Sequence, residues 1–489
     1  MQNNEPARVL QTTLLDFVRA NLHELNQPGS YANAEDGDFK LRDKIILESA
    51  LLLYVIDRSF PAHDALSQRL KACAQEVAAL AAEPRIIALI HKNPQYSLVL
   101  GLSFICLRKL GFNNPHYEAL LKRILALNKT HTSEKIPFRE LDIQWVRYLH
   151  NNREKPRITN HTSSVLSLNT SPIYMSKSDA YGVTHAIMYL TDFGASVELL
   201  KGYDKNNIHQ LLHYGLIWCI SVADFDLTAE LLMAYYFCRF EETAITTLCA
   251  NIIEDTYQRV GYLPGPCFDS AAHAKLERSE RDVYLFQNVY HTTYVFGLYL
   301  CASTLYKKQQ RHEAVAGHNT LKKSAQNKAV VRAANLKVRT LLKSRFAVGG
   351  IGAFKFAEYY SSEAPLRYLS HVTELASPES LLLREVNQRS WPAAAACRLL
   401  LDALIIGLSK DYSLERLVDV LCVGLNHFPA IAHEFLFQEA VEFLALQQTT
   451  EGAIGTFFYR PENFEEKKNE AILFHAKVIH LFDSYLAQV

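Results

Sequence analysis

The sequence lacks the short motifs that assign a function quickly. It has no CxxC pair among its nine cysteines, no Gly-x-Ser-x-Gly elbow, no His-Glu-x-x-His motif and no Rossmann glycine fingerprint. These absences leave serine hydrolases, zincin-type peptidases and dinucleotide-dependent enzymes without support. The odd, dispersed set of cysteines is typical of reduced core thiols and not of a disulfide framework.

Charge of one sign and long apolar runs are also lacking. Lys and Arg total 51, as do Asp and Glu, so no overall field selects nucleic acid or a membrane surface. Apolar runs such as Ile45–Ile56 and Leu399–Leu408 are interrupted by Glu48 and Asp402 and are too short to cross a bilayer. The N-terminus has no basic and apolar signal segment. We therefore expect a cytoplasmic protein that does not enter a membrane.

Helical periodicity is what the sequence does contain. Hydrophobic residues make up 49% of the 489 residues, which can supply a large core. Leu14, Val18 and Leu22 share one helical face, and glycine-bearing turns such as residues 260–262 separate the periodic stretches. Strand-like alternation is scarce. The pattern predicts an all-α protein made of antiparallel helical hairpins.

One turn near the C-terminus resembles a motif of α/α-toroid proteins. Residues 447–457 read QQTTEGAIGTF, which is similar to the Gln-x-x-Asp-Gly-x-x-Gly turn of that group, with Glu451 in place of the usual Asp. Prenyltransferases, triterpene cyclases and several carbohydrate-active enzymes share this architecture. The resemblance implies an α/α-toroid-like array of hairpins, while the alternative is a helix that ends at a glycine and continues as a loop.

Basic residues are concentrated between Lys307 and Arg345. Eleven Lys or Arg stand there against one acidic residue, Glu313. We predict a helical domain over residues 1–305, a basic connector over 306–346 and a C-terminal helical domain over 347–489. The basic stretch is either a solvated connector with a basic helix or a docking face for an acidic peptide, a phosphate-bearing ligand or RNA.

Residues 179–194, with the sequence DAYGVTHAIMYLTDFG, form the clearest candidate site. His185, Tyr189 and Asp192 are spaced i, i+4, i+7, so we expect them on one stripe of a helix. A core helix normally carries aliphatic side chains on such a stripe. Because buried polar groups cost free energy unless they are paired, a row of three indicates a function.

Two later helices are expected to add polar side chains to the same site. Asp226 and Glu230 are spaced i, i+4, and a predicted helix over residues 282–300 carries His291 and Tyr294 on one polar stripe. If these helices line the inner ring of a toroid, their polar stripes converge on one cavity.

Three segments together resemble an uncharacterised bacterial family of helical proteins. They are Thr184–Gly194, with the pattern Thr-His-x-x-x-Tyr-x-Thr-Asp-Phe-Gly, then Asp226–Leu231 and Tyr290–Thr293. The resemblance covers about residues 10–305. Members lie near natural-product and peptide-modification genes, which implies a tailoring enzyme without specifying a reaction.

The residue types at this candidate site fit two chemistries. Histidine and carboxylate side chains are ligands of zinc and non-haem iron. The predicted metal ligands are His185, Asp192, Asp226 and His291. The predicted catalytic residues, acting as an acid, a base or a hydrogen-bond donor, are Tyr189, Tyr294 and Glu230. The same groups also fit acid–base catalysis without a metal, and the sequence does not select among iron, zinc and no metal.

Two functions follow from these patterns. The first is a tailoring enzyme of bacterial secondary metabolism or peptide modification, which acts on a small molecule or peptide in a cavity lined by His, Asp and Tyr. The second is a non-catalytic helical scaffold that docks an acidic partner through residues 307–345.

Overall fold

The computed structural model describes residues 5–22, 25, 41–60, 65–127, 136–151, 156, 164–168, 170–309, 325–352, 354–362, 364–377, 380–389, 391–455 and 467–489. Over these residues the fold is all-α, as the sequence predicts, with an isolated bridge between Gln448 and Ile454 and no strand. None of the described helices has the length and apolarity needed to cross a bilayer.

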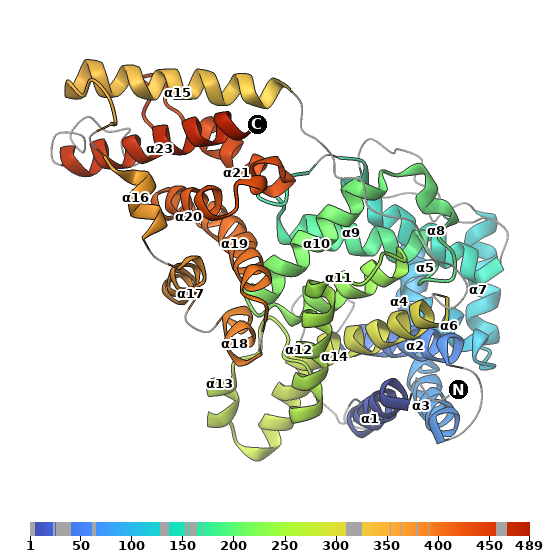
Figure 1. The fold of residues 1–489 in the computed structure, drawn as a ribbon. Coiled ribbons are helices and arrows are strands. Elements are labelled where there is room, and N and C mark those ends of the chain that lie inside the picture. The colour runs from blue at the N-terminus through green and yellow to red at the C-terminus, as the bar shows by residue number, and fades with distance from the viewer. Residues whose placement is uncertain are drawn as a thin grey trace. The chain divides into compact units, whose positions relative to one another are not determined.

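The chain divides into two compact units (Figure 1). The first comprises the described parts of residues 1–169, 176–216 and 224–316, and the second those of 170–175, 217–223 and 317–489. The helices that lie in the first unit are α1 (Glu5–Leu22), α2 (Leu41–Ser59), α3 (Ala65–Ala81), α4 (Pro84–Lys92), α5 (Ser97–Leu100), α6 (Leu102–Lys109), α7 (Pro115–Ala126), α8 (Pro137–Asn151), α9 (Lys177–Leu190), most of α10 (Lys205–Ser221), α11 (Phe225–Phe237), α12 (Ala244–Val260), α13 (Ser270–Lys275) and α14 (Arg278–Gln309).

Six helices of the first unit pack in a closed cycle, which we call the helix ring. Its members, in order of contact, are α2, α6, α8, α9, α11 and α14, and α14 packs back onto α2. Two neighbouring helices are parallel when the residue numbers of their contacting side chains increase in the same direction along both helices. These contacts are Glu48–His291 and Ser59–Lys308 for α2 and α14, Asp226–Thr292 and Tyr236–Tyr306 for α11 and α14, Tyr181–Asp226 and His185–Glu230 for α9 and α11, and Phe138–His185 and Trp145–Phe193 for α8 and α9. Five ring helices therefore run in one direction.

Parallel packing brings the N-terminal ends of several ring helices to one end of the ring. Asp226 lies in the first turn of α11, and Asp142 lies in the second turn of α8. The partial positive charge at a helix N-terminus favours carboxylates at such positions. This end of the ring is consequently suited to acidic side chains.

The close packing of α14 depends on Gly297. A Cβ atom at Gly297 would lie 2.3 Å from a side-chain atom of Leu14 and 2.9 Å from one of Leu52. A larger residue at this position would displace these leucine methyl groups, so glycine favours the close approach of α14 to α1 and α2. The same approach brings His291 within reach of Glu48 on α2.

The second unit is also helical. Its helices are α15 (Ala325–Phe346), α16 (Phe356–Ser361), α17 (Pro365–Ala376), α18 (Leu381–Gln388), α19 (Ala393–Lys410), α20 (Leu414–His427), α21 (Phe435–Leu446) and α23 (Lys468–Gln488). Helix α15 packs against α23 and α21, and α19 packs against α17, α20 and α21.

Part of the expected basic connector is a packed helix of the second unit, because residues 325–346 form α15. Several of its basic side chains have partners near the end of the chain. Lys328 donates to the main-chain oxygen of Val489, Arg339 pairs with Asp483, and Arg345 pairs with Glu451. These charges are thus balanced within the unit, while Arg332, Lys337 and Lys343 are exposed. Lys322 and Lys323, which belong to the predicted docking face, lie outside the described residues.

Candidate functional site

The helix ring lines a cavity of about 660 Å³ in the first unit. Its polar lining comes from five of the ring helices. The polar residues are Lys44, Glu48, Arg139, Asp142, Ser178, Tyr181, His185, Tyr189, Asp226, Glu230, His291 and Tyr294. All the ligands and catalytic residues predicted from the sequence, except Asp192, are among them.

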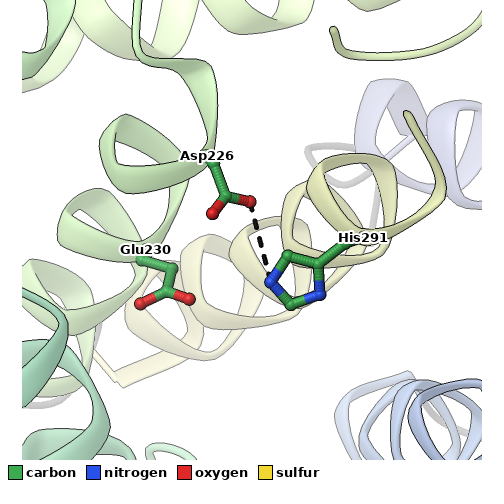
Figure 2. A group of neighbouring side chains, drawn as sticks. All are labelled: Asp226, Glu230 and His291. Atoms are coloured by element: carbon green, nitrogen blue, oxygen red, sulfur yellow. Dashed lines mark ion pairs between the residues drawn. The ribbon is translucent and has the colours of Figure 1, made fainter. Parts of the chain in front are cut away.

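Asp226, Glu230 and His291 form a compact group at the cavity wall (Figure 2), which we call the ligand triad. Each residue offers one ligand atom, and these atoms all lie within 4.8 Å of one another. Asp226 and Glu230 stand one turn apart on α11, and His291 comes from the neighbouring α14. Two carboxylates and an imidazole at this spacing are a donor set for a divalent transition metal.

Both oxygens of Asp226 accept hydrogen bonds from neighbouring hydroxyl groups. Tyr181 donates to Oδ2 at 2.7 Å, and Thr292 donates to Oδ1 at 3.0 Å. Burial raises the pKa of Asp226, and the nearby Glu230 adds to that rise, although His291 and the two hydroxyl groups oppose it. These bonds fix the orientation of the carboxylate, and each oxygen keeps a further lone pair.

Glu230 is held by two residues of α9. Thr184 donates to Oε2 at 2.5 Å, and Nε2 of His185 lies 3.5 Å from Oε1. Burial alone would raise the pKa of Glu230, but His185 and Thr184 outweigh burial and lower it. Glu230, predicted as a catalytic acid or base, therefore belongs to the ligand triad and contacts His185.

His291 lies between two carboxylates. Its Nδ1 atom is 2.9 Å from Oε2 of Glu48, and its Nε2 atom is 3.8 Å from Oδ1 of Asp226 (Figure 2). Burial lowers the pKa of His291, but Glu48 and Asp226 outweigh that effect and raise the pKa to about 9. For Glu48, burial is likewise outweighed, and His291 together with Lys44 lowers its pKa.

The cavity combines an excess of acidic groups with two imidazoles. The acidic groups are Glu48, Asp142, Asp226 and Glu230, the basic ones are Lys44 and Arg139, and the imidazoles are His185 and His291. When all four carboxyl groups are ionised, they carry four negative charges against two positive ones, and two protonated imidazoles balance the difference. A divalent cation bound to neutral imidazoles gives the same balance, so cation binding and proton release are coupled.

Tyr189 and Tyr294 line the cavity. The hydroxyl of Tyr189 faces the carboxylate of Asp142, which lies 3.3 Å from a guanidinium nitrogen of Arg139. Burial raises the pKa of Tyr189 well above its ordinary value, and Asp142 adds to the rise. The hydroxyl of Tyr294 lies 3.0 Å from that of Ser49. Tyr189 therefore remains a neutral phenol, which suits a hydrogen-bond donor and not a base.

Asp192 is not brought to the ligand triad. Helix α9 ends at Leu190, so Asp192 lies beyond the helix and not on its polar stripe. Asp192 and Phe193 have left-handed φ values of 48° and 50°. The indole nitrogen of Trp145 donates to Asp192 Oδ1 at 2.8 Å, and Nη1 of Arg58 lies 3.0 Å from the same oxygen. Asp192 thus holds a strained turn that brings Phe193 to the cavity wall.

Two further groups of reactive side chains, a histidine pair and a cysteine, lie away from the cavity lining. His209 and His213, spaced i, i+4 on α10, stack on each other with ring centroids 5.8 Å apart, and His209 Nε2 lies 3.0 Å from the hydroxyl of Tyr235. Cys267 is exposed, although the sequence favours a packed thiol at this position.

The sequence matches the family described as "Domain of unknown function (DUF6895)" over residues 12–301, which is more than half of the chain. The chain belongs to this family. The match agrees with the resemblance to an uncharacterised helical family over about residues 10–305, and it contains the whole ligand triad. No curated protein matches the chain, and no solved structure matches it.

Three residues of the family domain that shape the site were not singled out from the sequence. Glu48 stands alone in an apolar stretch of α2, Asp142 lies on α8, and Tyr181 precedes His185 by one turn of α9. A single carboxylate inside an apolar helix was the available signal for Glu48. The side chains of Asp142 and Tyr181 fit the ordinary pattern of amphipathic helices, so their role depends on how the helices pack.

Proposed function

We propose that this chain is a metal-dependent enzyme whose active site is the cavity of the helix ring. The observation that carries the proposal is the ligand triad, since three ligand atoms from two helices lie within 4.8 Å of one another at the wall of a cavity of about 660 Å³. A cavity of this volume accommodates a small molecule or a peptide side chain.

The surroundings of the triad support metal binding. Metal-bound histidines usually donate their other ring N–H to a carboxylate, and metal-bound carboxylates usually accept hydrogen bonds. Glu48 occupies the first role for His291, and Tyr181 and Thr292 occupy the second for Asp226. His185, close to Glu230, is the candidate for a fourth ligand. One or two imidazoles with two carboxylates suit zinc or non-haem iron.

The triad leaves room for a substrate on its cavity side, where a bound metal supplies Lewis acidity or activates a water molecule. Tyr189 donates a hydrogen bond to the reacting molecule from α9, and Tyr294 orients it from α14. The class of reaction is that of a tailoring enzyme on a small molecule or peptide.

The biological setting in this proposal is bacterial secondary metabolism or peptide modification, which rests on the resemblance of Thr184–Gly194 and its partner segments. The toroid assignment is part of the proposal as well. A closed cycle of helices, five of them parallel, is the arrangement expected for the inner ring of an α/α toroid.

A second candidate function is acid–base catalysis without a metal. The observation that favours it is the position of His291 between Glu48 and Asp226, which raises the pKa of its imidazole to about 9. A protonated His291 next to Asp226, whose pKa is also raised, could transfer a proton to a substrate in the cavity.

The non-catalytic alternative is a scaffold that docks an acidic partner. Arg332, Lys337 and Lys343 are exposed on α15 and favour it, whereas Lys328, Arg339 and Arg345 already have partners in the second unit. The enzyme proposal rests on a buried polar cavity, which a scaffold does not require.

Metal content tests the proposal. The purified chain is analysed for iron and zinc, stripped, and titrated with Co²⁺, whose visible absorption reports the ligand set. We expect one ion per chain, and binding at least 100-fold weaker in Asp226→Asn and His291→Gln. His150→Gln is the matched control, because His150 pairs with the single carboxylate of Glu118 at 3.2 Å. A chain that binds no metal, or variants that bind it normally, would overturn the proposal.

A further inference from the structure

The cavity has an apolar part that the ligand triad does not use. Buried aliphatic and aromatic side chains from five ring helices meet there, and we call them the apolar floor. They are Leu52, Leu102, Met188, Phe193, Met233 and Leu298. None of these side chains carries a polar group, so the floor has no function in metal binding or proton transfer.

The lining of the cavity changes from charged to apolar along three of the parallel helices, α2, α11 and α14, whereas on α8 the apolar Phe138 precedes Arg139 and Asp142. On α2 the order is Lys44, Glu48, Leu52, and on α11 it is Asp226, Glu230, Met233. On α14, His291 is followed by Val295 and Leu298. Because these helices run in one direction, their charged residues gather at one end of the cavity and their apolar residues at the other. The apolar floor therefore lies on the C-terminal side of the ligand triad.

Exposure follows the same order. The side chains of Lys44 and Arg139 are 47% and 53% exposed, whereas Met233 is fully buried and Leu298 is 8% exposed. A molecule from solvent therefore passes the two basic side chains first, then the ligand triad, and reaches the apolar floor last.

The rise of an α-helix gives the depth of the floor. At 1.5 Å per residue, Leu52 lies about 6 Å beyond Glu48, and Leu298 lies about 10 Å beyond His291. This depth suits a short aliphatic chain. Leucine and methionine side chains, which adapt their rotamers to a flexible ligand, supply most of the floor.

We infer that the substrate is an amphiphile, with a short aliphatic chain in the apolar floor and a polar group at the ligand triad. A polar group on the far end of the chain would lose its hydration among Met233, Phe193 and Leu298 without gaining a hydrogen bond, and such burial is costly. The cavity thus selects for a substrate whose aliphatic chain carries no polar group at the end that lies in the apolar floor. This inference names the substrate class of the proposed enzyme and rests on that proposal for the role of the triad.

A series of straight-chain primary alcohols, from butanol to decanol, tests the inference on the full-length protein. Their affinities are measured by calorimetric titration, with the protein both stripped of metal and loaded with Co²⁺. We expect affinity to rise about fourfold per methylene, corresponding to ~0.8 kcal/mol for each buried CH₂ group, until the floor is full. Beyond that length the affinity should level off or fall.

Two variants change the floor in opposite directions. Met233→Phe should move the longest favourable alcohol to a shorter chain, and Leu298→Ala should move it to a longer one. Both should retain Co²⁺ binding, which also shows that they fold. If Met233→Phe fails to fold, the shift in Leu298→Ala still decides. A terminal diol of the best length should bind at least tenfold more weakly than the alcohol.

The outcomes separate this inference from the proposed function. Affinities that do not depend on chain length, or that do not shift in Leu298→Ala, would overturn the inference even if Co²⁺ binds to the ligand triad. Chain-length dependence in a protein that binds no metal would support the inference and contradict the metal-dependent function.

Discussion

The imidazole of His291 is oriented by Glu48, whose Oε2 atom lies 2.9 Å from Nδ1. The two residues are 243 positions apart in the chain and belong to the neighbouring parallel helices α2 and α14. The contact directs Nε2 toward Asp226, 3.8 Å away. A carboxylate behind a histidine both fixes the ring and makes it a more basic ligand. The arrangement of the ligand triad therefore depends on a residue outside it.

Replacement of Glu48 tests this dependence. We expect Glu48→Gln to weaken Co²⁺ binding by about 10–100-fold, the usual effect of losing a carboxylate behind a metal-bound histidine. The measurement is the dissociation constant from a Co²⁺ titration. Glu118→Gln is the control, since Glu118 contacts His150 in a similar carboxylate–imidazole pair that does not belong to the ligand triad. Equal affinities for the wild type and Glu48→Gln would contradict the role given to Glu48.

The pH dependence of stability follows from the raised pKa of His291, about 9 in the folded protein against an ordinary value of 6.5. A raised pKa means that protonation favours the folded state. This contribution is complete below about pH 6.5 and is lost as the pH rises through about 9. The free energy of unfolding of the metal-free protein should therefore fall over this range, and more steeply than in His291→Gln. Urea unfolding at several pH values measures the free energy of unfolding. If this free energy changes with pH equally in the wild type and in His291→Gln, the result would be evidence against a proton held on His291 by Glu48 and Asp226.

Metal affinity should change with pH in the opposite sense. Because the metal binds the neutral imidazole, each ion displaces a proton from His291 below pH 9. The apparent Co²⁺ affinity should rise by up to about tenfold per pH unit toward pH 9 and then level off. Titrations in buffers of different pH give the slope, and an affinity independent of pH would exclude His291 as a ligand.

Asp192 should affect stability and not metal binding. Asp192→Ala leaves the buried indole N–H of Trp145 without its acceptor, which costs about 1–3 kcal/mol. Asp192→Asn keeps an acceptor and tolerates the left-handed backbone, so it should cost less. Urea unfolding and Co²⁺ titration of both variants separate the two properties. Lost Co²⁺ binding at unchanged stability would restore Asp192 as a ligand.

Charge reversal on α15 tests the internal role of the basic stretch. Arg339→Glu places a negative charge beside Asp483 and should lower the unfolding temperature, by an amount equivalent to about 0–1 kcal/mol for an exposed pair. Arg332→Glu, exposed on the same helix, is the control and should leave it unchanged. If both variants melt like the wild type but lose an acidic partner, the stretch is a docking face.

Several features of the fold could be predicted from local patterns. The all-α class followed from periodicity, and the 282–300 helix lies within α14. His185, Asp226, Glu230 and His291 were identified because polar side chains at helical spacing are unusual in apolar helices, and all four line one cavity. Spacing alone could not place Asp192, because α9 ends two residues earlier in a left-handed turn.

The remaining site residues depend on packing between distant segments. Glu48 and Asp402 look alike in the sequence, each a lone carboxylate in an apolar run. The structure brings Glu48 to His291, whereas Asp402 pairs with Arg398 on its own helix, 3.0 Å away. The difference arises from the packing of α14 against α2, two helices that are far apart in the sequence, which no local pattern encodes.

The position of a bound ion tests the central claim most directly. Crystals grown with Co²⁺ and measured at the cobalt absorption edge give an anomalous difference map. The account predicts one strong peak in the helix ring, roughly 2.0–2.2 Å from a carboxylate oxygen of Asp226, a carboxylate oxygen of Glu230 and Nε2 of His291. A map with no peak at these residues, or with its main peak at His209 and His213, would contradict the account.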